Sequence, residues 1–447
     1  MASSKAVILI GGPSKGTRFR PLSLDIPKPL FPIAGRALLW HSIQAASKVD
    51  GLHEVILIGF YDDAIIAPFV KAASIDFPNL SIRYMREYQS LGTAGGLYHF
   101  RDSILRNNPD QIFVLHADIA CNFPLAQIKD FHDRHRGVGT VMGVKVSSRV
   151  TLSKLSTRAR GSSRRLYTLF RHQVPRETAT KFGCIVIDPQ TQQARHYVEK
   201  PESFISETIN GGIYLFDKTI FDEIRVAMET KLRRNSDDPT LPQDDQLRLE
   251  QDVIAPLAAS KKLYVYQALG AWTQIKSAAS AIPANTLILA SYKTTNPLLL
   301  RRRSPTITAE NRAHASAMAR ASKAIKAEII EPCFIDETAE VDPTAKVGPN
   351  VSIGAGVKIG YGCRVKESII LDNTTLDKNA CVINSIISED CKLGPWSRVE
   401  GSSFGDEKQS IAILAKHVSV LKEVHVRSCI VLPSKVLSKN SKNEVLL

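Results

Sequence analysis

The sequence lacks long hydrophobic runs and has few cysteines, and each shortage excludes a class of protein. No apolar stretch approaches the ~18 residues that a membrane-spanning helix needs, and no charged-then-apolar leader precedes the first predicted strand. The seven cysteines are odd in number and include no closely spaced pair of the zinc-finger kind. We therefore expect a cytoplasmic protein in a reducing compartment, with no membrane partner.

Acidic residues are absent from one stretch of the chain. Residues 149–176 hold eight Lys or Arg and no Asp or Glu, so the formal net charge of +14 falls by eight to +6 outside them. Basicity confined to one segment does not indicate a nucleic-acid-binding face, and the segment holds only two aromatic residues that could stack on bases. We interpret residues 149–176 as a basic, mostly disordered insertion and expect no nucleic-acid partner.

The remaining composition is that of a globular protein with two or three domains. Its 447 residues are 44% hydrophobic, which allows large cores. From Lys5 to about Lys145, short apolar runs alternate with amphipathic stretches, which is typical of a doubly wound parallel sheet. We expect this Rossmann-like α/β domain to span residues 1–291, and residues 292–328, where the alternation is lost, to form a linker.

A six-residue spacing of apolar residues marks the C-terminal part, residues 329–447. Neither a helix nor an amphipathic strand has a period of six, whereas short strands that turn a corner every sixth residue do. The pattern predicts a left-handed parallel β-helix of hexapeptide repeats, whose stacked coils commonly form a rigid assembly surface. The apolar residues of the repeat are Ile335, Val341, Val347, Ile353, Ile359, Val365, Leu371, Ile387, Leu393, Val399, Val418, Val424 and Ile430.

A glycine-rich loop follows the first predicted strand, residues 6–10. Its spacing is neither that of a Walker loop nor that of a dinucleotide fingerprint. Because ligands of open α/β sheets bind at the carboxyl ends of the strands, the loop is a candidate phosphate cradle, with Arg18, Arg20 and Lys28 as countercharges. Taken alone, the same glycines are explained about equally well by a tight structural turn.

Two further motifs lie at the same predicted sheet edge. Asp118 follows the buried strand 112–116, within plausible reach of a phosphate-bound Mg²⁺, although an aspartate there could equally cap the next helix. Residues 91–96, Leu-Gly-Thr-Ala-Gly-Gly, form a second glycine-rich turn. This turn could receive a base or a ribose by close backbone approach.

An ordered set of motifs along the chain resembles a known family. In sequence order they are Gly11-Gly12, Gly16-Thr17-Arg18-Phe19-Arg20-Pro21, Pro27-Lys28-Pro29, Leu91-Gly92-Thr93-Ala94-Gly95, Asp118, Glu199-Lys200-Pro201 and Asn210. Sugar-1-phosphate nucleotidyltransferases carry the same motifs in the same order. With the hexapeptide tail, the chain resembles the GDP-mannose pyrophosphorylases of this family, and only residues 149–176 and parts of the linker fall outside the resemblance.

The resemblance implies a nucleotidyl transfer, in which a mannose-1-phosphate oxygen attacks the α-phosphate of GTP, pyrophosphate leaves and GDP-mannose forms. Such chemistry needs two aligned polyanions and stabilised charge, with Mg²⁺ as cofactor and no covalent enzyme nucleophile. The residues that the resemblance assigns to nucleotide binding are Gly11, Gly12, Gly16, Thr17, Gly92, Thr93 and Gly95. Arg18 and Lys28 are assigned to catalysis, and Asp118 is assigned to the metal. The residues assigned to sugar binding are Gly183, Glu199, Lys200 and Asn210.

Two departures from the family pattern affect this predicted site. Catalytic members close the metal site with a second aspartate in a Trp-x-Asp-Ile-Gly motif, whereas this chain reads Trp272-Thr273-Gln274-Ile275-Lys276. The neutral Gln274 removes a negative charge and Lys276 adds a cation, so metal binding should weaken more than nucleotide binding. The opening loop is also longer than in the family, with Pro13-Ser14-Lys15 where one residue would suffice.

Both departures are features of the alpha-type branch of the family, which resembles a regulatory partner of the catalytic beta-type subunit. We therefore expect a regulatory subunit that binds GDP-mannose and pairs with a catalytic homologue, with itself or with both. The alternative is an active transferase that binds GTP and mannose-1-phosphate. A third interpretation is a scaffold similar to subunits of the nucleotide-exchange factor of translation initiation, which share the two-domain architecture.

Overall fold

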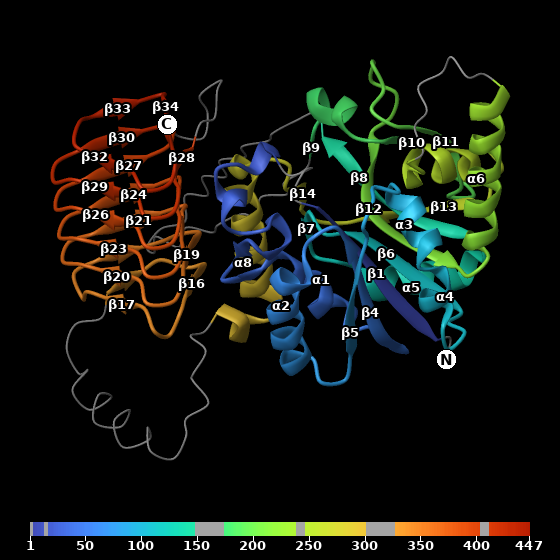
Figure 1. The fold of residues 1–447 in the computed structure, drawn as a ribbon, viewed down its shortest axis with the longest axis horizontal. Helices are drawn as coiled ribbons and strands as arrows, with labels where there is room; N and C mark the ends of the chain where they lie inside the picture. Colours follow the sequence, from blue (N-terminus) through green and yellow to red (C-terminus); the bar gives the residue numbers. More distant parts are fainter. Residues whose placement is uncertain (1–2, 13–16, 148–173, 238–245, 301–326, 403–410) are drawn as a thin grey trace, which may run out of the picture. The chain divides into compact units, whose positions relative to one another are not determined.

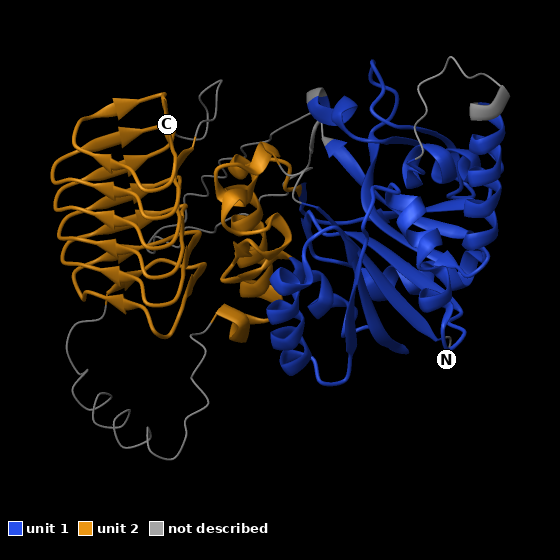
Figure 2. Ribbon diagram, in the orientation of Figure 1, with its two compact units in different colours: residues 1–13, 39–273 blue, residues 14–38, 274–447 orange. Residues whose placement is uncertain are grey.

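A computed structural model describes residues 3–12, 17–147, 174–237, 246–300, 327–402 and 411–447 of the chain (Figure 1). The chain divides into two compact units. The first comprises Met1–Pro13 and Leu39–Thr273, and the second comprises Ser14–Leu38 and Gln274–Leu447 (Figure 2). The predicted insertion up to residue 173 and residues 301–326 of the predicted linker lie outside the described residues. The predicted domain limits therefore stay predictions.

The apolar runs near the N-terminus form the parallel core of the first unit. Strands β1 (Ser4–Gly11), β4 (Leu52–Gly59), β5 (Ser81–Arg86) and β6 (Gln111–His116) are all parallel, in the order β6-β1-β4-β5. Val7 and Ile56 are fully buried, as expected where helices cover both faces of a sheet. The connecting helices are α1 (Leu38–Ala46), α2 (Asp63–Asp76), α3 (Thr93–His99) and α4 (Arg101–Leu105). The predicted doubly wound sheet is confirmed.

Antiparallel strands extend this sheet beyond β6. Strand β12 (Thr208–Asp217) pairs with β6, β8 (Gly139–Ser147) pairs with β12, and β13 (Leu263–Ala268) runs parallel to β8. The register between β12 and β8 shifts between Asn210 and Tyr214, where Gly212 has a φ of +70°. Such a bulge changes the direction of a strand and re-aims a side chain, and here it affects Asn210.

Shorter elements complete the first unit. They are β7 (Ile119–Cys121), α5 (Leu125–His135), β9 (Val174–Pro175), η5 (Arg176–Lys181), β10 (Cys184–Ile187), β11 (Ala194–Val198), α6 (Ile220–Asp237), the π-helix η6 (Leu249–Ile254), α7 (Ala255–Ala259) and β14 (Trp272–Gln274), which ends at the boundary with the second unit. Among the described helices of the chain, none combines the length and the apolar character that crossing a bilayer demands.

Three sheets of short parallel strands make up most of the second unit. Each strand pairs with the strands three places before and after it, which is the connectivity of a parallel β-helix and bears out the predicted architecture (Figure 1). The first sheet holds β15 (Glu328–Ile329), β18 (Lys346–Val347), β21 (Arg364–Lys366), β24 (Cys381–Ile383), β27 (Arg398–Glu400), β30 (His425–Arg427) and β33 (Ser441–Lys442). The second holds β16 (Cys333–Ile335), β19 (Val351–Ile353), β22 (Ile369–Ile370), β25 (Ser385–Ile387), β28 (Ala412–Leu414), β31 (Ile430–Val431) and β34 (Val445–Leu446). The third holds β17 (Glu340–Val341), β20 (Lys358–Ile359), β23 (Thr375–Leu376), β26 (Lys392–Leu393), β29 (Ser419–Val420) and β32 (Val436–Leu437).

The strict six-residue spacing breaks at two points in this β-helix. Ile353 pairs with Ile370 rather than with Leu371. Ile370 therefore belongs to the apolar core of the β-helix, whereas Leu371 is buried outside that core. In the same way Val431, and not Ile430, lies in the core. The prediction was wrong at these positions because a coil one residue shorter turns the neighbouring side chain to the opposite face of the strand.

A buried amide joins the N-terminal residues of the second unit to the β-helix. Asn285 is 1% exposed, and its Oδ1 accepts hydrogen bonds from the Ala34 N–H at 2.8 Å and from the Ser352 Oγ at 2.6 Å. Gly35, with a φ of +73°, lies so close to the Phe334 ring that a Cβ there would overlap it. These contacts attach the segment that follows the glycine loop to strands β16 and β19.

The other elements of the second unit are short, apart from one helix. They are η2 (Thr17–Phe19), η3 (Leu22–Leu24), η4 (Lys28–Leu30), β2 (Pro32–Ile33), β3 (Arg36–Ala37), η7 (Ala278–Ser280), α8 (Ala281–Thr295) and η8 (Pro297–Leu300). Asn285, the residue that makes the buried contacts, lies on α8.

Candidate functional site

Gly11 ends strand β1 at the carboxyl edge of the sheet, and Gly12 follows it. Gly11 has a φ of +68°, and its carbonyl accepts a hydrogen bond from the Phe60 N–H at 2.8 Å. A Cβ on Gly12 would lie 2.6 Å from the Phe60 Cβ, so a larger residue would force the two strand ends apart. Both glycines thus lie where an anion could approach the backbone. Gly16, the third predicted phosphate glycine, lies outside the described residues.

Four predicted site residues belong to the second unit. Thr17 and Arg18 are the exposed residues of the turn η2, Lys28 begins η4 and is half-buried, and Gln274 ends β14. The predicted phosphate-binding set is therefore divided between the two units along the sequence. The roles of these four residues stay predictions.

Three of the four predicted sugar-binding residues meet around one tyrosine. The Asn210 Nδ2 donates hydrogen bonds to the Tyr197 Oη at 3.0 Å and to the Tyr214 Oη at 2.8 Å. The Tyr197 Oη donates in turn to the Glu199 Oε2 at 2.7 Å. The Gly183 carbonyl accepts from the Asn210 N–H at 2.8 Å, and a Cβ on Gly183 would overlap the Tyr197 hydroxyl. The structure thus joins Gly183, Glu199 and Asn210 in one cluster, which we call the sugar cluster.

Lys200 lies at the exposed end of the sugar cluster. Its Nζ is 3.3 Å from the second carboxylate oxygen, Glu199 Oε1, and its side chain is 64% exposed. Burial, together with the Glu199 charge, raises the pKa of Tyr197 far above its ordinary value, so this phenol stays protonated. Glu199 is therefore oriented by Tyr197 on one oxygen and by Lys200 on the other. Its remaining lone pairs could accept hydrogen bonds from sugar hydroxyls, and the Lys200 ammonium could form an ion pair with a phosphate.

A half-buried pair, His116 and Glu250, which the sequence analysis did not predict, contacts this cluster through Tyr214. The His116 Nε2 lies 3.1 Å from the Glu250 Oε1, which also accepts a hydrogen bond from the Tyr214 Oη at 3.3 Å. Burial would lower the pKa of His116, but the nearby Glu250 carboxylate, with the charges of Asp118 and Glu199, raises it. The Glu250 carboxylate therefore lies between the His116 ring and the Tyr214 hydroxyl and contacts both.

The sequence contains little that predicts this contact between His116 and Glu250. His116 ends a buried strand, which is a weak signal, whereas Glu250 lies on the π-helix η6, a segment of mixed apolar and polar residues without a recognisable motif. One of its partners, the Thr93 Oγ1 at 3.4 Å, is 157 residues away along the chain. A π-helical turn is itself frequent at functional sites, but the sequence pattern does not distinguish it from an ordinary helix.

The second glycine-rich turn, residues 92–95, packs against the chain itself. The Leu247 carbonyl accepts hydrogen bonds from the Ala94 N–H at 3.0 Å and from the Gly95 N–H at 3.2 Å. Gly92 has a φ of +82°, and a Cβ there would overlap the Leu247 carbonyl. The Thr93 Oγ1 accepts from the Leu249 N–H at 2.8 Å. The close approach that these glycines permit is made to residues 247–249, and contact with a nucleoside stays a prediction.

Known families match both parts of the chain. The family model described as Nucleotidyl transferase matches residues 5–151 and 146–243, and the model described as GMPPB C-terminal domain matches residues 329–446. The chain is 40% identical over 465 residues to the "Probable mannose-1-phosphate guanyltransferase" of Schizosaccharomyces pombe, with 99% of this chain and 100% of the relative covered. The chain belongs to the mannose-1-phosphate guanylyltransferase family.

Two further members of this family carry a more specific name. The "Mannose-1-phosphate guanylyltransferase regulatory subunit alpha" of Dictyostelium discoideum is 40% identical over 460 residues, covering 100% of this chain and 99% of the relative. The protein of the same name from Homo sapiens is 40% identical over 466 residues, covering 99% of this chain and 100% of the relative. The likeness to these guanylyltransferase relatives therefore extends over the full length of the chain.

Asp118 is the predicted metal ligand of this guanylyltransferase-family chain. It is half-buried and lies between β6 and β7, and β7 pairs with β14, where the Trp272 Nε1 donates to the Gly211 carbonyl at 3.0 Å. Within the described ranges, no group of three or more His, Cys, Asp or Glu residues is placed to hold a metal ion. Mg²⁺ at phosphate sites needs one or two carboxylates together with substrate oxygens. The role of Asp118 as a metal ligand therefore stays a prediction.

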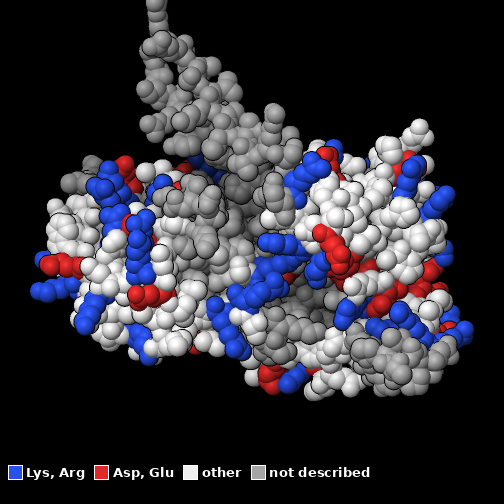
Figure 3. All heavy atoms as spheres, turned by 90° about the horizontal axis from the view of Figure 1, so that it is seen from above, with Lys and Arg blue, Asp and Glu red and all other residues white. Residues whose placement is uncertain are grey.

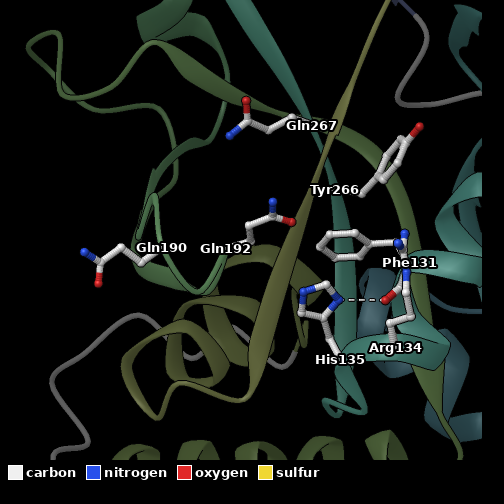
Figure 4. A pocket seen from close by; sticks show the side chains of 7 residues that line it. All are labelled: Phe131, Arg134, His135, Gln190, Gln192, Tyr266 and Gln267. Atoms are coloured by element: carbon white, nitrogen blue, oxygen red, sulfur yellow. Dashed lines mark hydrogen bonds between the residues drawn. The ribbon is translucent and has the colours of Figure 1, made fainter.

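A pocket of about 460 Å³ lies elsewhere in the first unit (Figure 4). The residues that line it are Phe131, Arg134 and His135 of α5, Gln190 and Gln192 of the turn between β10 and β11, and Tyr266 and Gln267 of β13. The Phe131 and His135 rings stack with their centroids 4.1 Å apart. None of the predicted site residues lines this pocket, so we do not assign nucleotide chemistry to it.

Proposed function

We propose that this chain is a regulatory subunit of a mannose-1-phosphate guanylyltransferase complex and that it binds GDP-mannose without making it. The observation that carries the proposal is Gln274, which stands where catalytic members of the resembled family have their second aspartate. The two relatives named regulatory subunit alpha support it. Such a subunit would pair with the catalytic homologue, with itself or with both.

The sugar cluster supports binding of a sugar nucleotide. Glu199 offers a carboxylate that is already oriented by two donors, and Asn210 is fixed at the bulge of β12. Lys200 would pair with the phosphate attached to the sugar. Gly11 and Gly12 would contact the phosphates through the backbone at the end of β1, with Arg18 and Lys28 as countercharges. This set of residues can hold a sugar nucleotide without activating a nucleophile.

Asp118 would hold Mg²⁺ together with phosphate oxygens. When bound, the ion would neutralise charge on the phosphates. With one carboxylate in place of two, the ion should bind weakly and only in the presence of nucleotide.

Seven free thiols within the described residues also favour a reducing compartment, and we therefore propose a cytoplasmic location.

An active mannose-1-phosphate guanylyltransferase is the second candidate. It is favoured by the relative from Schizosaccharomyces pombe, whose name states that activity. The Gln274 side chain retains a carbonyl oxygen, which could replace a carboxylate as a weaker ligand.

Calorimetric titration of GDP-mannose, combined with a turnover assay, distinguishes the two candidates. We expect binding of GDP-mannose, and no pyrophosphate release from GTP and mannose-1-phosphate with Mg²⁺. Lys200→Gln should weaken binding roughly tenfold, because a charge-assisted contact is lost. Lys218→Gln, an exposed lysine of the same unit, should leave binding unchanged. Pyrophosphate release at an ordinary enzyme rate, about 1 s⁻¹ or faster, would overturn the regulatory role.

A further inference from the structure

One half-buried carboxylate of the first unit, that of Glu250, contacts two separate parts of the proposed binding site. Asp and Glu side chains on the face seen in Figure 3 lie at the surface, many of them beside Lys or Arg, whereas the Glu250 side chain is 17% exposed. Its carboxylate contacts His116, Tyr214 and Thr93 instead. Removing a carboxylate from water costs free energy, so its position inside the unit needs an explanation.

The first part is the second glycine-rich turn, residues 92–95, which we call the nucleoside turn. The Leu249 N–H donates a hydrogen bond to the Thr93 Oγ1 at 2.8 Å, and the Thr93 hydroxyl donates its own proton to the Glu250 Oε2 at 3.4 Å. Because the hydroxyl accepts from one group and donates to the other, both contacts determine its direction. One oxygen of Glu250 is therefore attached to the nucleoside turn.

The second part is the sugar cluster, which Glu250 contacts through Tyr214. The Tyr214 Oη donates to the Glu250 Oε1 at 3.3 Å and accepts from the Asn210 Nδ2 at 2.8 Å. Tyr214 is fully buried, and its ring stacks on the Phe216 ring with centroids 5.7 Å apart. The Tyr214 hydroxyl cannot turn to solvent, so the other oxygen of Glu250 is attached to Asn210 through it.

Asn210 has one position left for a sugar hydroxyl. Both N–H groups of its Nδ2 donate within the cluster, one to the Tyr197 Oη and one to the Tyr214 Oη. Its Oδ1 accepts a hydrogen bond from the Gly212 N–H at 2.9 Å and retains a second lone pair. This amide can therefore only accept from a sugar hydroxyl, and the direction of the lone pair depends on both tyrosines.

We propose that Glu250 is a positioning residue that sets the distance between the nucleoside and the sugar of bound GDP-mannose. This inference rests on the proposed binding of GDP-mannose. A carboxylate has two acceptor oxygens, and here each one receives a hydroxyl proton from a different part of the site. Glu250 also lies on the π-helix Leu249–Ile254, and π-helical turns are frequent at functional sites. A site whose parts are already held at the right distance loses less freedom when the ligand binds.

Replacement of Glu250 by glutamine tests this inference at nearly constant side-chain volume. An amide has only one acceptor oxygen, so the Glu250→Gln side chain can accept from Thr93 or from Tyr214 but not from both. We expect the affinity for GDP-mannose to fall roughly tenfold, and the affinity for GDP, which lacks the sugar, to fall by about twofold at most. Calorimetric titration of the full chain measures both. Their ratio is the readout, because a purely structural role would lower both affinities alike.

Asp252→Asn is the matched control, since it makes the same chemical change on the same π-helix. The Asp252 Oδ2 accepts from the Arg248 N–H at 2.7 Å and lies 3.4 Å from the Lys231 Nζ. Neither partner belongs to the sugar cluster or to the nucleoside turn. The control should lower the midpoint of thermal unfolding and leave the ratio of the two affinities at its native value.

Tyr214→Phe is a second test variant, because it removes the hydroxyl between Glu250 and Asn210 and retains the buried ring. By itself it should reduce the preference for GDP-mannose over GDP, which keeps the inference testable if Glu250→Gln does not fold. In the Tyr214→Phe chain, Glu250→Gln should change the ratio of affinities by a much smaller factor than in the native chain. Equal factors in the two chains would show that Glu250 does not act through this hydroxyl.

The possible outcomes separate this inference from the proposed function. A native ratio of affinities in Glu250→Gln would overturn the positioning role and leave the binding of GDP-mannose intact. Failure of the native chain to bind GDP-mannose would overturn both. Equal affinities of the native chain for GDP and GDP-mannose would also contradict the inference, because the sugar cluster would then contribute nothing to binding.

Discussion

Gly183 determines how the sugar cluster is assembled. The absence of a side chain lets the Tyr197 hydroxyl lie against the Gly183 backbone, where it receives a hydrogen bond from Asn210 and donates one to Glu199. A single tyrosine oxygen thus sets the distance between two groups that would bind the sugar. The cluster depends on the space at one glycine, because any Cβ there would displace this oxygen.

Gly183→Ala should therefore weaken GDP-mannose binding more than it weakens the fold. The added Cβ pushes Tyr197 aside and releases Glu199 and Asn210, and we expect at least a tenfold loss of affinity, about 1.4 kcal/mol, in calorimetric titration. Gly137→Ala is the control, since its Cβ would lie 2.6 Å from the Tyr264 ring, which is not part of the cluster. The control should lower the unfolding midpoint without a specific loss of binding. Equal affinities for the two variants would show that the cluster does not bind the sugar.

Side chains that act through distant partners are the part of the site that sequence reasoning did not find. Asn210 and Glu199 belong to short motifs, so a resemblance can locate them. Glu250 belongs to no motif, and its role depends on His116 and Thr93, which only the folded sheet brings near it. Local pattern carries no information on such pairs, because their spacing in sequence is set by the lengths of intervening helices and loops.

The strands of the β-helix show the same limit of prediction from sequence. Its period follows from sequence because a six-residue repeat has few structural solutions. Its register does not, because the loss of one residue before Ile370 moves that side chain, and not Leu371, into the core. The parallel part of the first sheet was also predictable from apolar runs, whereas the antiparallel strands around β12 were not, since their pairing is non-local.

Glu400 makes the stability of this element depend on pH. The carboxylate on β27 contacts the Arg398 Nε at 2.6 Å, the His425 Nε2 at 3.0 Å and the Arg427 Nε at 3.8 Å, and Cys381 lies on the adjacent strand β24. Burial would raise the pKa of Glu400, but Arg398 and His425 lower it below its ordinary value of 4.5. A lowered pKa stabilises the fold above pH 4.5, and this contribution is lost as the pH falls through the lowered value.

Glu400→Gln should accordingly destabilise the chain at neutral pH by roughly 1 kcal/mol, because the cations lose their carboxylate. The difference from the native chain should shrink as the pH falls from 4.5 through the lowered pKa of Glu400, where the carboxylate of the folded chain becomes protonated. Urea unfolding at a series of pH values measures this difference. Glu340→Gln, at an exposed position of β17, should show a smaller difference that does not follow this pH dependence. A constant difference for Glu400→Gln would contradict the role of its charge.

On the scale of the whole molecule, Asn285 connects parts of the second unit that are far apart in sequence. Asn285→Ala leaves the Ala34 N–H and the Ser352 hydroxyl without their acceptor in a buried position, which should cost about 1–3 kcal/mol. We expect faster hydrogen exchange of amides in residues 17–38 and little change in β6 of the first unit. Thr294→Ala, at an exposed position of the same helix, should have no such effect. Unchanged protection of residues 17–38 would show that other contacts hold this segment.

The two units are interleaved along the chain, because residues 14–38 belong with residues 274–447 while the sequence between them forms the other unit. A single genetic crossover within residues 39–273 therefore divides the second unit between two parents. In such a hybrid, the N-terminal segment comes from one parent and the β-helix from the other. Gly35 would then pack against the residue that the second parent has at the position of Phe334. We therefore expect coupled evolution of two parts of the chain, the β-helix and the segment that contains Arg18 and Lys28.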